Sequence, residues 1–167
     1  TGVQCIPINT LYQIYAASRR TPDVLDRARR LLTMPDLINM RLTGRAVSEF
    51  TNATTTQCLD GRTRTWARDL LSDLGVPVRL FGPIVDPGTT LGGLSANASA
   101  AMAGTPVVAP ACHDTGSAVA SVHAGGTTAF LSSGTWSLVG TEVGAPVITA
   151  RSRDLNFTNE GGVAGTT

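Results

Sequence analysis

A change of sequence pattern near Gly104 constrains the fold more than any other feature. Before it, residues 1–75 repeat apolar side chains every three or four positions, which is typical of amphipathic helices. From residue 105 onward, short apolar runs alternate with glycine-containing turns, which indicates strands. Residues 76–104 are rich in Pro, Gly, Ala and Ser and predict strand fragments and turns that lead to a domain junction. We therefore expect residues 1–104 and residues 105–167 to belong to two different domains.

Four helices are expected in the first half of the chain. Thr21-Pro22-Asp23 predicts a helix start, because it combines a hydroxyl cap, a proline in the first turn and an acid near the positive end of the helix dipole. The apolar stripe of this expected helix continues to Leu32. Pro35-Asp36 opens the next helix, which Gly44 should end as a C-terminal cap. The expected helices begin at Asn9-Thr10, at Thr21, at Pro35 and at Thr63, and the last carries Trp66 on its apolar face and extends to Gly75.

The stretch 49–57 lies between these helices. It is too polar for a hydrophobic core, yet too uniform in residue type for a solvated linker. In the second half, a small-residue turn at His113 is expected to lead into a helix that extends to Ala120. Four strands are expected there, at residues 106–109, 129–132, 137–140 and 156–159.

Composition argues against several classes of protein. Hydrophobic residues make up 42% of the 167 residues and suit a globular core, and thirteen Arg, without any Lys, against twelve acidic residues leave a net charge of +1. No basic patch predicts nucleic-acid binding, and no apolar stretch or signal peptide predicts a membrane partner or export. Cys5, Cys58 and Cys112 are widely spaced without a CxxC pair, so a zinc site is unsupported and free thiols in the cytoplasm are expected.

Asp114 is the candidate catalytic residue. It follows the short apolar run 106–109 and precedes several small residues, so that a substrate can approach its carboxylate. A general base must lie within hydrogen-bond reach of the proton that it accepts, and the flanking His113 and Thr115 offer imidazole and hydroxyl contacts to a polyol. The alternative, on pattern alone, is that Asp114 caps the following helix by accepting bonds from its free N–H groups.

A second small polar turn, Ser132-Ser133-Gly134-Thr135, lies between two apolar strands. Glycine lets the backbone approach a ligand, and turned amides with hydroxyls can surround phosphate oxygens, so Gly134 and Thr135 are candidate nucleotide contacts. An ordinary hairpin turn is the alternative. No Gly-Lys-Ser/Thr follows, which excludes a Walker A loop. A Ser-His-Asp hydrolase triad is disfavoured, because His113 and Asp114 are sequence neighbours and no Gly-x-Ser-x-Gly elbow is present.

Segments in collinear order along nearly the whole chain resemble the FGGY family of carbohydrate kinases. Four of them carry the general resemblance: Asn9-Thr10-Leu11-Tyr12-Gln13, Met34-Pro35-Asp36, Arg41-Leu42-Thr43-Gly44 and Thr51-Asn52-Ala53-Thr54-Thr55-Thr56-Gln57. Three more resemble the branch of the family that acts on L-rhamnulose. Other members of the family usually carry a Gly-Asp-Gln-type segment around the catalytic base instead. These are Cys112-His113-Asp114-Thr115, Ser132-Ser133-Gly134-Thr135-Trp136-Ser137 and Thr158-Asn159-Glu160-Gly161-Gly162.

This resemblance implies an α/β fold, a fragment of the two-domain actin-like (ribonuclease-H-like) sugar kinase architecture with its active site between the domains. Residues 1–104 would be the later part of the N-terminal domain, and residues 105–167 the start of the C-terminal domain. The implied reaction is phosphorylation of the C1 hydroxyl of L-rhamnulose by ATP with Mg²⁺, in the cytoplasm. The resemblance assigns the proton-accepting role to Asp114, sugar contacts to His113, Asp114 and Thr115, and ATP phosphate contacts to Gly134 and Thr135; it assigns no metal ligand within the chain.

Two other functions stay open. One is another ketose kinase of the family, acting on xylulose, ribulose or fuculose. The other is a non-catalytic sugar-binding relative, against which the Asp114 carboxylate argues, because binding alone needs no base. We expect both ends of the chain to be cuts through a longer protein. The implied partners are the sugar, ATP and the flanking segments of the same protein, and the chain alone is expected to bind ATP weakly and to turn over no sugar.

Overall fold

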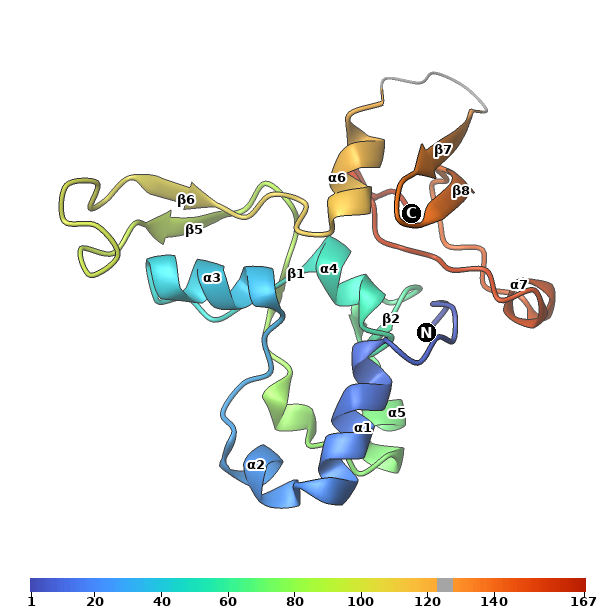
Figure 1. Cartoon of the computed structure of the whole chain (residues 1–167), viewed down its shortest axis with the longest axis horizontal. Helices are drawn as coiled ribbons and strands as arrows, with labels where there is room; N and C mark the ends of the chain where they lie inside the picture. The colour runs from blue at the N-terminus through green and yellow to red at the C-terminus, as the bar shows by residue number, and fades with distance from the viewer. Residues whose placement is uncertain (123–127) are drawn as a thin grey trace.

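The computed structural model describes residues 1–122 and 128–167 (Figure 1). Its α-helices are α1 (Thr10–Arg20), α2 (Pro22–Arg27), α3 (Met34–Thr43), α4 (Phe50–Thr55), α5 (Arg68–Asp73), α6 (Asp114–Ala120) and α7 (Ala150–Asp154). Its strands are β1 (Ser48–Glu49), β2 (Leu59–Asp60), β3 (Thr65–Trp66), β4 (Ile84–Val85), β5 (Thr90–Gly93), β6 (Pro106–Val108), β7 (Ala129–Ser133) and β8 (Ser137–Thr141). Two 3₁₀ turns, η1 (Val78–Leu80) and η2 (Val163–Gly165), complete the described elements.

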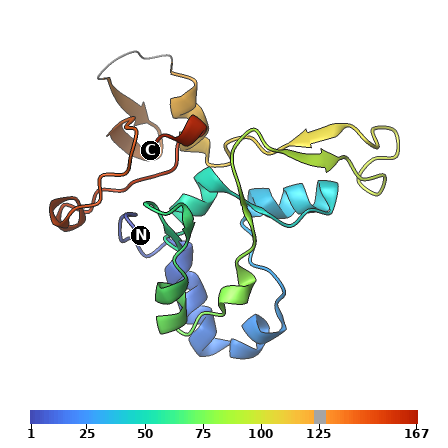
Figure 2. The ribbon, with the colours of Figure 1, turned by 180° about the vertical axis from the view of Figure 1, so that it is seen from behind.

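The strands form two-stranded sheets throughout the described ranges. β1 pairs with β4 in parallel, whereas β2–β3, β5–β6 and β7–β8 are antiparallel. In Figure 1, α1, α2 and α5 gather at the bottom, β5–β6 extends as an arm beside α3, and α6 lies with the β7–β8 hairpin at the top. Figure 2 shows from behind that α4 lies at the centre, between these three groups. The central helix is therefore the place where the parts of the chain meet.

The main hydrophobic core lies among α1, α4, α5 and η1. Each large side chain buried there contributes roughly 1.5–3 kcal/mol from the area removed from water. The Trp66 and Phe81 rings pack at 4.9 Å between centroids in a tilted arrangement. The buried members of this core are Leu11, Ile14, Leu25, Phe50, Ala53, Cys58, Leu59, Trp66, Leu71, Val76, Leu80 and Phe81.

The helices expected at Asn9-Thr10 and at Pro35 are confirmed as α1 and α3. Gly44 ends α3 in the left-handed conformation, with φ of 78° and its N–H bonded to the Met40 carbonyl. The helix expected from Thr21 to Leu32 is wrong beyond Arg27. At Ala28 the backbone becomes extended. The Arg79 guanidinium donates to the carbonyls of residues 25, 26 and 28, and the Leu31 N–H donates to the Leu80 carbonyl, so these groups are no longer available to continue the helix.

The helix expected from Thr63 to Gly75 is shorter than predicted. It is confined to α5, and Trp66 lies in β3, where its indole N–H donates to the Gly82 carbonyl at 2.7 Å. The prediction that the stretch 49–57 is too polar for a core is wrong: most of it forms the helix α4, whose residues are largely buried. Its polar side chains form hydrogen bonds with one another and with the backbone, and these bonds offset the free-energy cost of removing polar groups from water.

In the second half, β6, β7, β8 and α6 confirm the predicted strands and helix. The strand expected at 156–159 is wrong: this segment is irregular, and Asn156 has a positive φ of 54°. β5 and β6 pair across the predicted junction at Gly104, with Gly93 opposite Pro106. The division of the chain at residue 104 stays a prediction.

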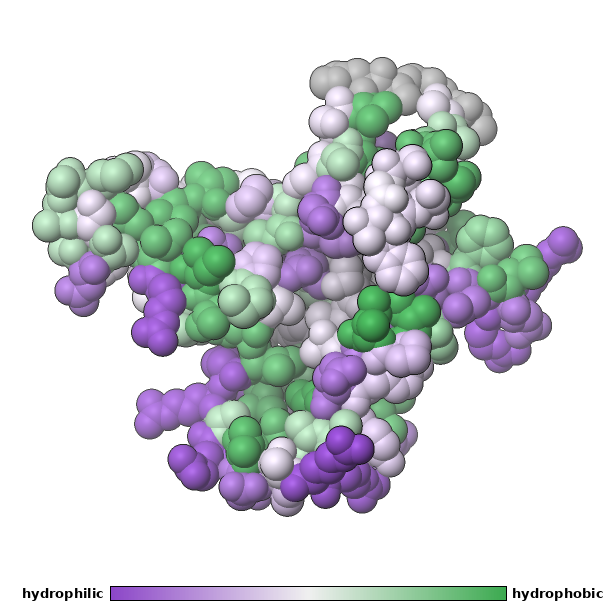
Figure 3. All heavy atoms as spheres, in the orientation of Figure 1, coloured by the Kyte–Doolittle hydropathy of each residue, from purple (hydrophilic) through white to green (hydrophobic). Residues whose placement is uncertain are grey.

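None of the helices in ranges 1–122 and 128–167 combines the length and the apolar character that crossing a bilayer requires. Hydrophobic side chains do reach the surface on α3, β6 and the β7–β8 hairpin (Figure 3). The most exposed of these are Met34, Ile38, Val108, Leu131, Trp136 and Val139.

Candidate functional site

A fully buried carboxylate at the start of α4 organises the centre of the molecule. Glu49 has no exposed surface and is the N-cap of α4, although glutamate is an uncommon capping residue. Its two carboxylate oxygens accept bonds from the Thr51 N–H at 2.9 Å, the Thr51 hydroxyl at 2.6 Å and the Asn52 N–H at 3.1 Å. These bonds satisfy amides that a helix start otherwise leaves without partners.

A second buried carboxylate extends this network from α3. Asp36 accepts from the Glu49 N–H at 2.9 Å and from the Thr33 hydroxyl at 2.8 Å. The Asn52 amide in turn donates to the Thr33 hydroxyl at 2.7 Å. Burial raises the pKa of Asp36 above its ordinary value, and its hydrogen bonds with Glu49 and Thr33 only partly oppose this. α3, β1 and α4 are thus joined by one polar network.

The same network holds the segment that precedes Asp114. The Cys112 N–H donates to the Glu49 carboxylate at 2.9 Å, and the His113 N–H donates to the Thr51 hydroxyl at 3.2 Å. Burial, with further contributions from the Glu49 and Asp36 carboxylates, raises the pKa of the Cys112 thiol to about 11. Two consecutive backbone amides are therefore fixed to side chains that lie more than 60 residues earlier in the chain.

The structure brings His113, Asp114 and Thr115 together at the start of α6. His113 is the N-cap, and its ring is only 19% exposed, whereas the Asp114 side chain is 97% exposed. The Thr115 N–H donates to Asp114 Oδ1 at 2.7 Å, and His113 Nε2 lies 3.6 Å from the same oxygen. Asp114 thus shares in capping the first turn, as the alternative prediction has it, while its carboxylate stays open to solvent.

Sequence reasoning gave no role to Glu160, which lies beside His113. The Glu160 carboxylate is 3.3 Å from His113 Nδ1. The next residue, Gly161, donates its N–H to the Thr54 hydroxyl of α4 at 2.9 Å. The only available signal was the Thr-Asn-Glu-Gly-Gly segment itself, which carried the family resemblance without indicating what it contacts.

Gly134 and Thr135 lie in the exposed turn of the β7–β8 hairpin, as the sequence predicts. The Gly134 N–H donates to the Trp136 carbonyl at 2.8 Å, so this amide is already engaged within the turn. Thr135, the next residue in the turn, is exposed. Among the described residues, no hydrogen bond or ion pair joins this turn to residues 113–115.

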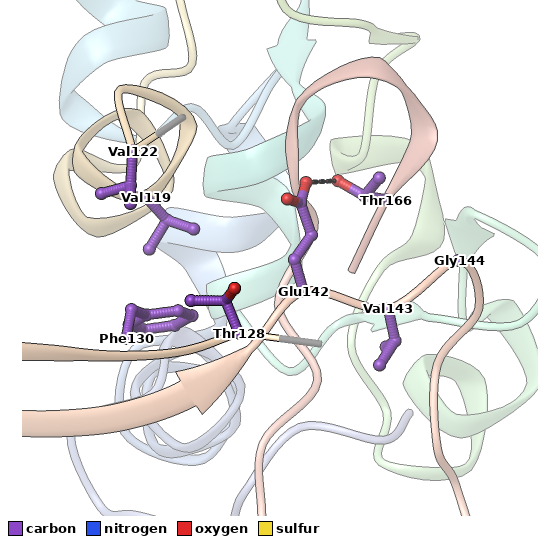
Figure 4. A pocket seen from close by; sticks show the side chains of 8 residues that line it. All are labelled: Val119, Val122, Thr128, Phe130, Glu142, Val143, Gly144 and Thr166. Carbon is purple, nitrogen blue, oxygen red and sulfur yellow. Dashed lines mark hydrogen bonds between the residues drawn. The ribbon is translucent and has the colours of Figure 1, made fainter. Parts of the chain in front are cut away.

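A cavity of about 230 Å³ lies between α6 and the β7–β8 hairpin (Figure 4). Its apolar side is formed by Val119, Val122 and Phe130. On its polar side, the Thr166 hydroxyl donates to the Glu142 carboxylate at 2.6 Å. None of the predicted site residues lines it. In ranges 1–122 and 128–167, no group of three His, Cys, Asp or Glu side chains is arranged to hold a metal ion.

Comparison with known proteins identifies the family. The model of the FGGY family of carbohydrate kinases, N-terminal domain, matches residues 1–121. The chain belongs to the FGGY family of carbohydrate kinases.

Curated relatives narrow the likeness further. The chain is 46% identical over 167 residues to a rhamnulokinase of Yersinia pestis, with 99% of this chain and 34% of the relative covered. It is 44% identical over 169 residues to one of Bacteroides thetaiotaomicron and 42% identical over 163 residues to one of Oceanobacillus iheyensis, covering 99% and 97% of this chain and 35% of each relative. The chain therefore spans about a third of the length of these relatives.

Solved structures confirm the predicted fold class. A xylulose kinase from Lactobacillus acidophilus superposes with a TM-score of 0.78 at 22% identity, covering 91% of this chain and 32% of that one. A carbohydrate kinase from Novosphingobium aromaticivorans superposes with a TM-score of 0.69 at 29% identity, covering 84% and 32%. The described elements are thus part of the α/β fold of FGGY sugar kinases.

Proposed function

We propose that the protein containing this chain phosphorylates the C1 hydroxyl of L-rhamnulose with ATP and Mg²⁺ in the cytoplasm, and that Asp114 is its catalytic base. The identity of 42–46% to rhamnulokinases over nearly all of the chain supports the substrate. The observation that carries the catalytic assignment is the exposed Asp114 carboxylate on a backbone segment fixed by partly buried hydrogen bonds to Glu49 and Thr51. A rigid backbone with an accessible carboxylate is what a positioned base requires.

The neighbours of Asp114 suit this role. The Thr115 N–H occupies Oδ1, which fixes the carboxylate and leaves Oδ2 to accept the proton of a sugar hydroxyl. As that proton leaves, the hydroxyl oxygen forms a bond to the γ-phosphorus, the bond from that phosphorus to the β–γ bridging oxygen breaks, and ADP departs. His113 and Thr115 flank the carboxylate and hold neighbouring hydroxyls of the sugar.

ATP would supply the phosphoryl group when bound, and the Mg²⁺ bound with it would neutralise the negative charge that builds on the phosphate oxygens. Thr135 suits contact with this group, because it is exposed on the tight turn between β7 and β8. We propose that Thr135 and, after its amide leaves the Trp136 carbonyl, Gly134 contact phosphate oxygens. The described residues offer no cluster for Mg²⁺, so we assign it no ligand from this chain.

A substrate panel on the full-length kinase tests this function. ADP release should be fastest with L-rhamnulose, compared with xylulose, ribulose and fuculose. Asp114→Asn should lower kcat by about 10²–10⁴-fold, the usual contribution of a general base. Because the side chain is exposed, the variant should keep its melting temperature. A preference for another ketose would overturn the substrate, and a fully active Asp114→Asn would overturn the base.

A further inference from the structure

His113 carries an unusual buried nitrogen. Nδ1 is buried, and within residues 1–122 and 128–167 it has no hydrogen-bond partner in good geometry. The Glu160 carboxylate lies 3.3 Å away, within ion-pair distance but out of line for a hydrogen bond. A buried polar atom without a partner costs about 1–3 kcal/mol. A small rotation of either side chain would turn this contact into a charge-assisted hydrogen bond, as occurs when a site tightens around its substrate.

Helix α4 brings the two residues together. Thr51 accepts the His113 N–H, and one turn later Thr54 accepts the Gly161 N–H. Gly161 is buried, and a Cβ at this position would collide with the Phe50 ring. The backbone on both sides of the His113–Glu160 contact is therefore fixed to the same face of one helix. His113 and Glu160 are 47 positions apart in the sequence, and hydrogen bonds from the backbone at His113 and at Gly161 to α4 hold them next to each other.

We propose that Glu160 is a positioning residue for His113. Its carboxylate accepts a hydrogen bond from Nδ1–H, which fixes the plane of the ring and leaves Nε2 as a hydrogen-bond acceptor beside Asp114, where a sugar hydroxyl binds. Which ring nitrogen of a histidine carries the proton is set by the bond that the other nitrogen makes. The two carboxylates facing the ring are Glu160 at Nδ1 and Asp114 at Nε2. This inference rests on the proposed sugar contact of His113.

The direct test is ¹⁵N NMR of the full-length kinase labelled on the histidine ring, with the His113 signals identified by their loss in His113→Gln. In the wild type, Nδ1 should carry the proton. Glu160→Ala should shift the proton toward Nε2. Glu160→Gln should keep it on Nδ1, because its amide oxygen still accepts. Asp154→Asn is the matched control: Asp154 is an exposed carboxylate whose one ion-pair partner among the described residues is its neighbour Arg153, so this variant should leave the His113 signals unchanged.

Kinetics separate positioning from a purely structural role. For the ketose that the substrate panel selects, Glu160→Ala should raise KM about tenfold, the loss typical of one charge-assisted hydrogen bond, with a smaller change in kcat. Glu160→Gln should restore most of that loss. His113 signals that are the same in Glu160→Ala and wild type would overturn the proposal, as would a changed tautomer with an unchanged KM. Failure of the proposed function would show instead as no turnover of any ketose, whatever the NMR result.

Discussion

Replacing Glu49 with Gln should loosen the catalytic segment without touching it. The carboxylate accepts one bond at Oε1, from the Thr51 N–H, and three at Oε2, from the Thr51 hydroxyl and the Asn52 and Cys112 amides. A glutamine must place an NH₂ group, a donor, at one of these positions. At least one buried donor then loses its acceptor, at about 1–3 kcal/mol, and the remaining bonds lose their charged partner, for a total of about 2–4 kcal/mol.

Hydrogen exchange on the full-length kinase measures this loss locally. If the amides of residues 51, 52 and 112 exchange by local opening, they should exchange about 30- to 1000-fold faster in Glu49→Gln, since about 1.4 kcal/mol is tenfold. Glu142→Gln is the control, because Glu142 is exposed and, within the part of the chain that the structure describes, its carboxylate accepts one hydrogen bond, from the Thr166 hydroxyl. Exchange at residue 112 that is unchanged in Glu49→Gln would refute the claim that this buried carboxylate holds the segment before Asp114.

Two further predictions concern the cysteines and the close packing at α4. In the native protein, exposed Cys5 should alkylate first and fully buried Cys58 last. Burial raises the pKa of the Cys58 thiol from 9.0 to about 12. The buried neutral thiol therefore contributes its full stability below pH 9, and this contribution is lost as the pH rises toward 12. The free energy of unfolding should fall more over that pH range in the wild type than in Cys58→Ala. Gly161→Ala should destabilise by about 1–3 kcal/mol through overpacking against α4, measured by thermal unfolding. Gly144→Ala, where an added Cβ meets nothing within 4 Å, should be neutral.

Each of these has a result that would count against it. Equal alkylation rates at Cys5 and Cys58 would show that the core around Cys58 opens readily. A pH dependence of stability that Cys58→Ala leaves unaltered above pH 9 would assign the alkaline loss to other groups. A neutral Gly161→Ala would mean that the Glu160–Gly161 segment can move away from α4, and it would weaken the argument that this segment is fixed.

Local signals in the sequence were enough for some elements of the fold. The Pro35-Asp36 start and the Gly44 end of α3 are written in neighbouring residues, and the structure has both. The end of α2 was not predictable in this way, because Arg79, far along the chain, takes the carbonyls that would have continued the helix. Trp66 has an apolar spacing that suits a helix, yet its indole N–H bonds Gly82 from a strand. In both cases tertiary contacts override the local preference.

The candidate site divides in the same way. His113, Asp114 and Thr115 were found because their residue types and family motif are local, and the structure places them together at the start of α6. Glu49 and Glu160 were missed as contributors, because their importance comes from partners more than 40 residues away. A polar stretch such as residues 49–57 looks unsuited to a core until its hydrogen bonds are known.

In the proposed mechanism, Asp114 accepts the proton of the C1 hydroxyl of L-rhamnulose. A crystal structure of the full-length kinase with L-rhamnulose and a non-hydrolysable ATP analogue tests it most directly. The C1 oxygen should lie within about 3.2 Å of the Asp114 carboxylate, with another sugar hydroxyl donating to His113 Nε2. A sugar bound with a different hydroxyl at Asp114, or with no hydroxyl in reach of it, would rule out this role for Asp114.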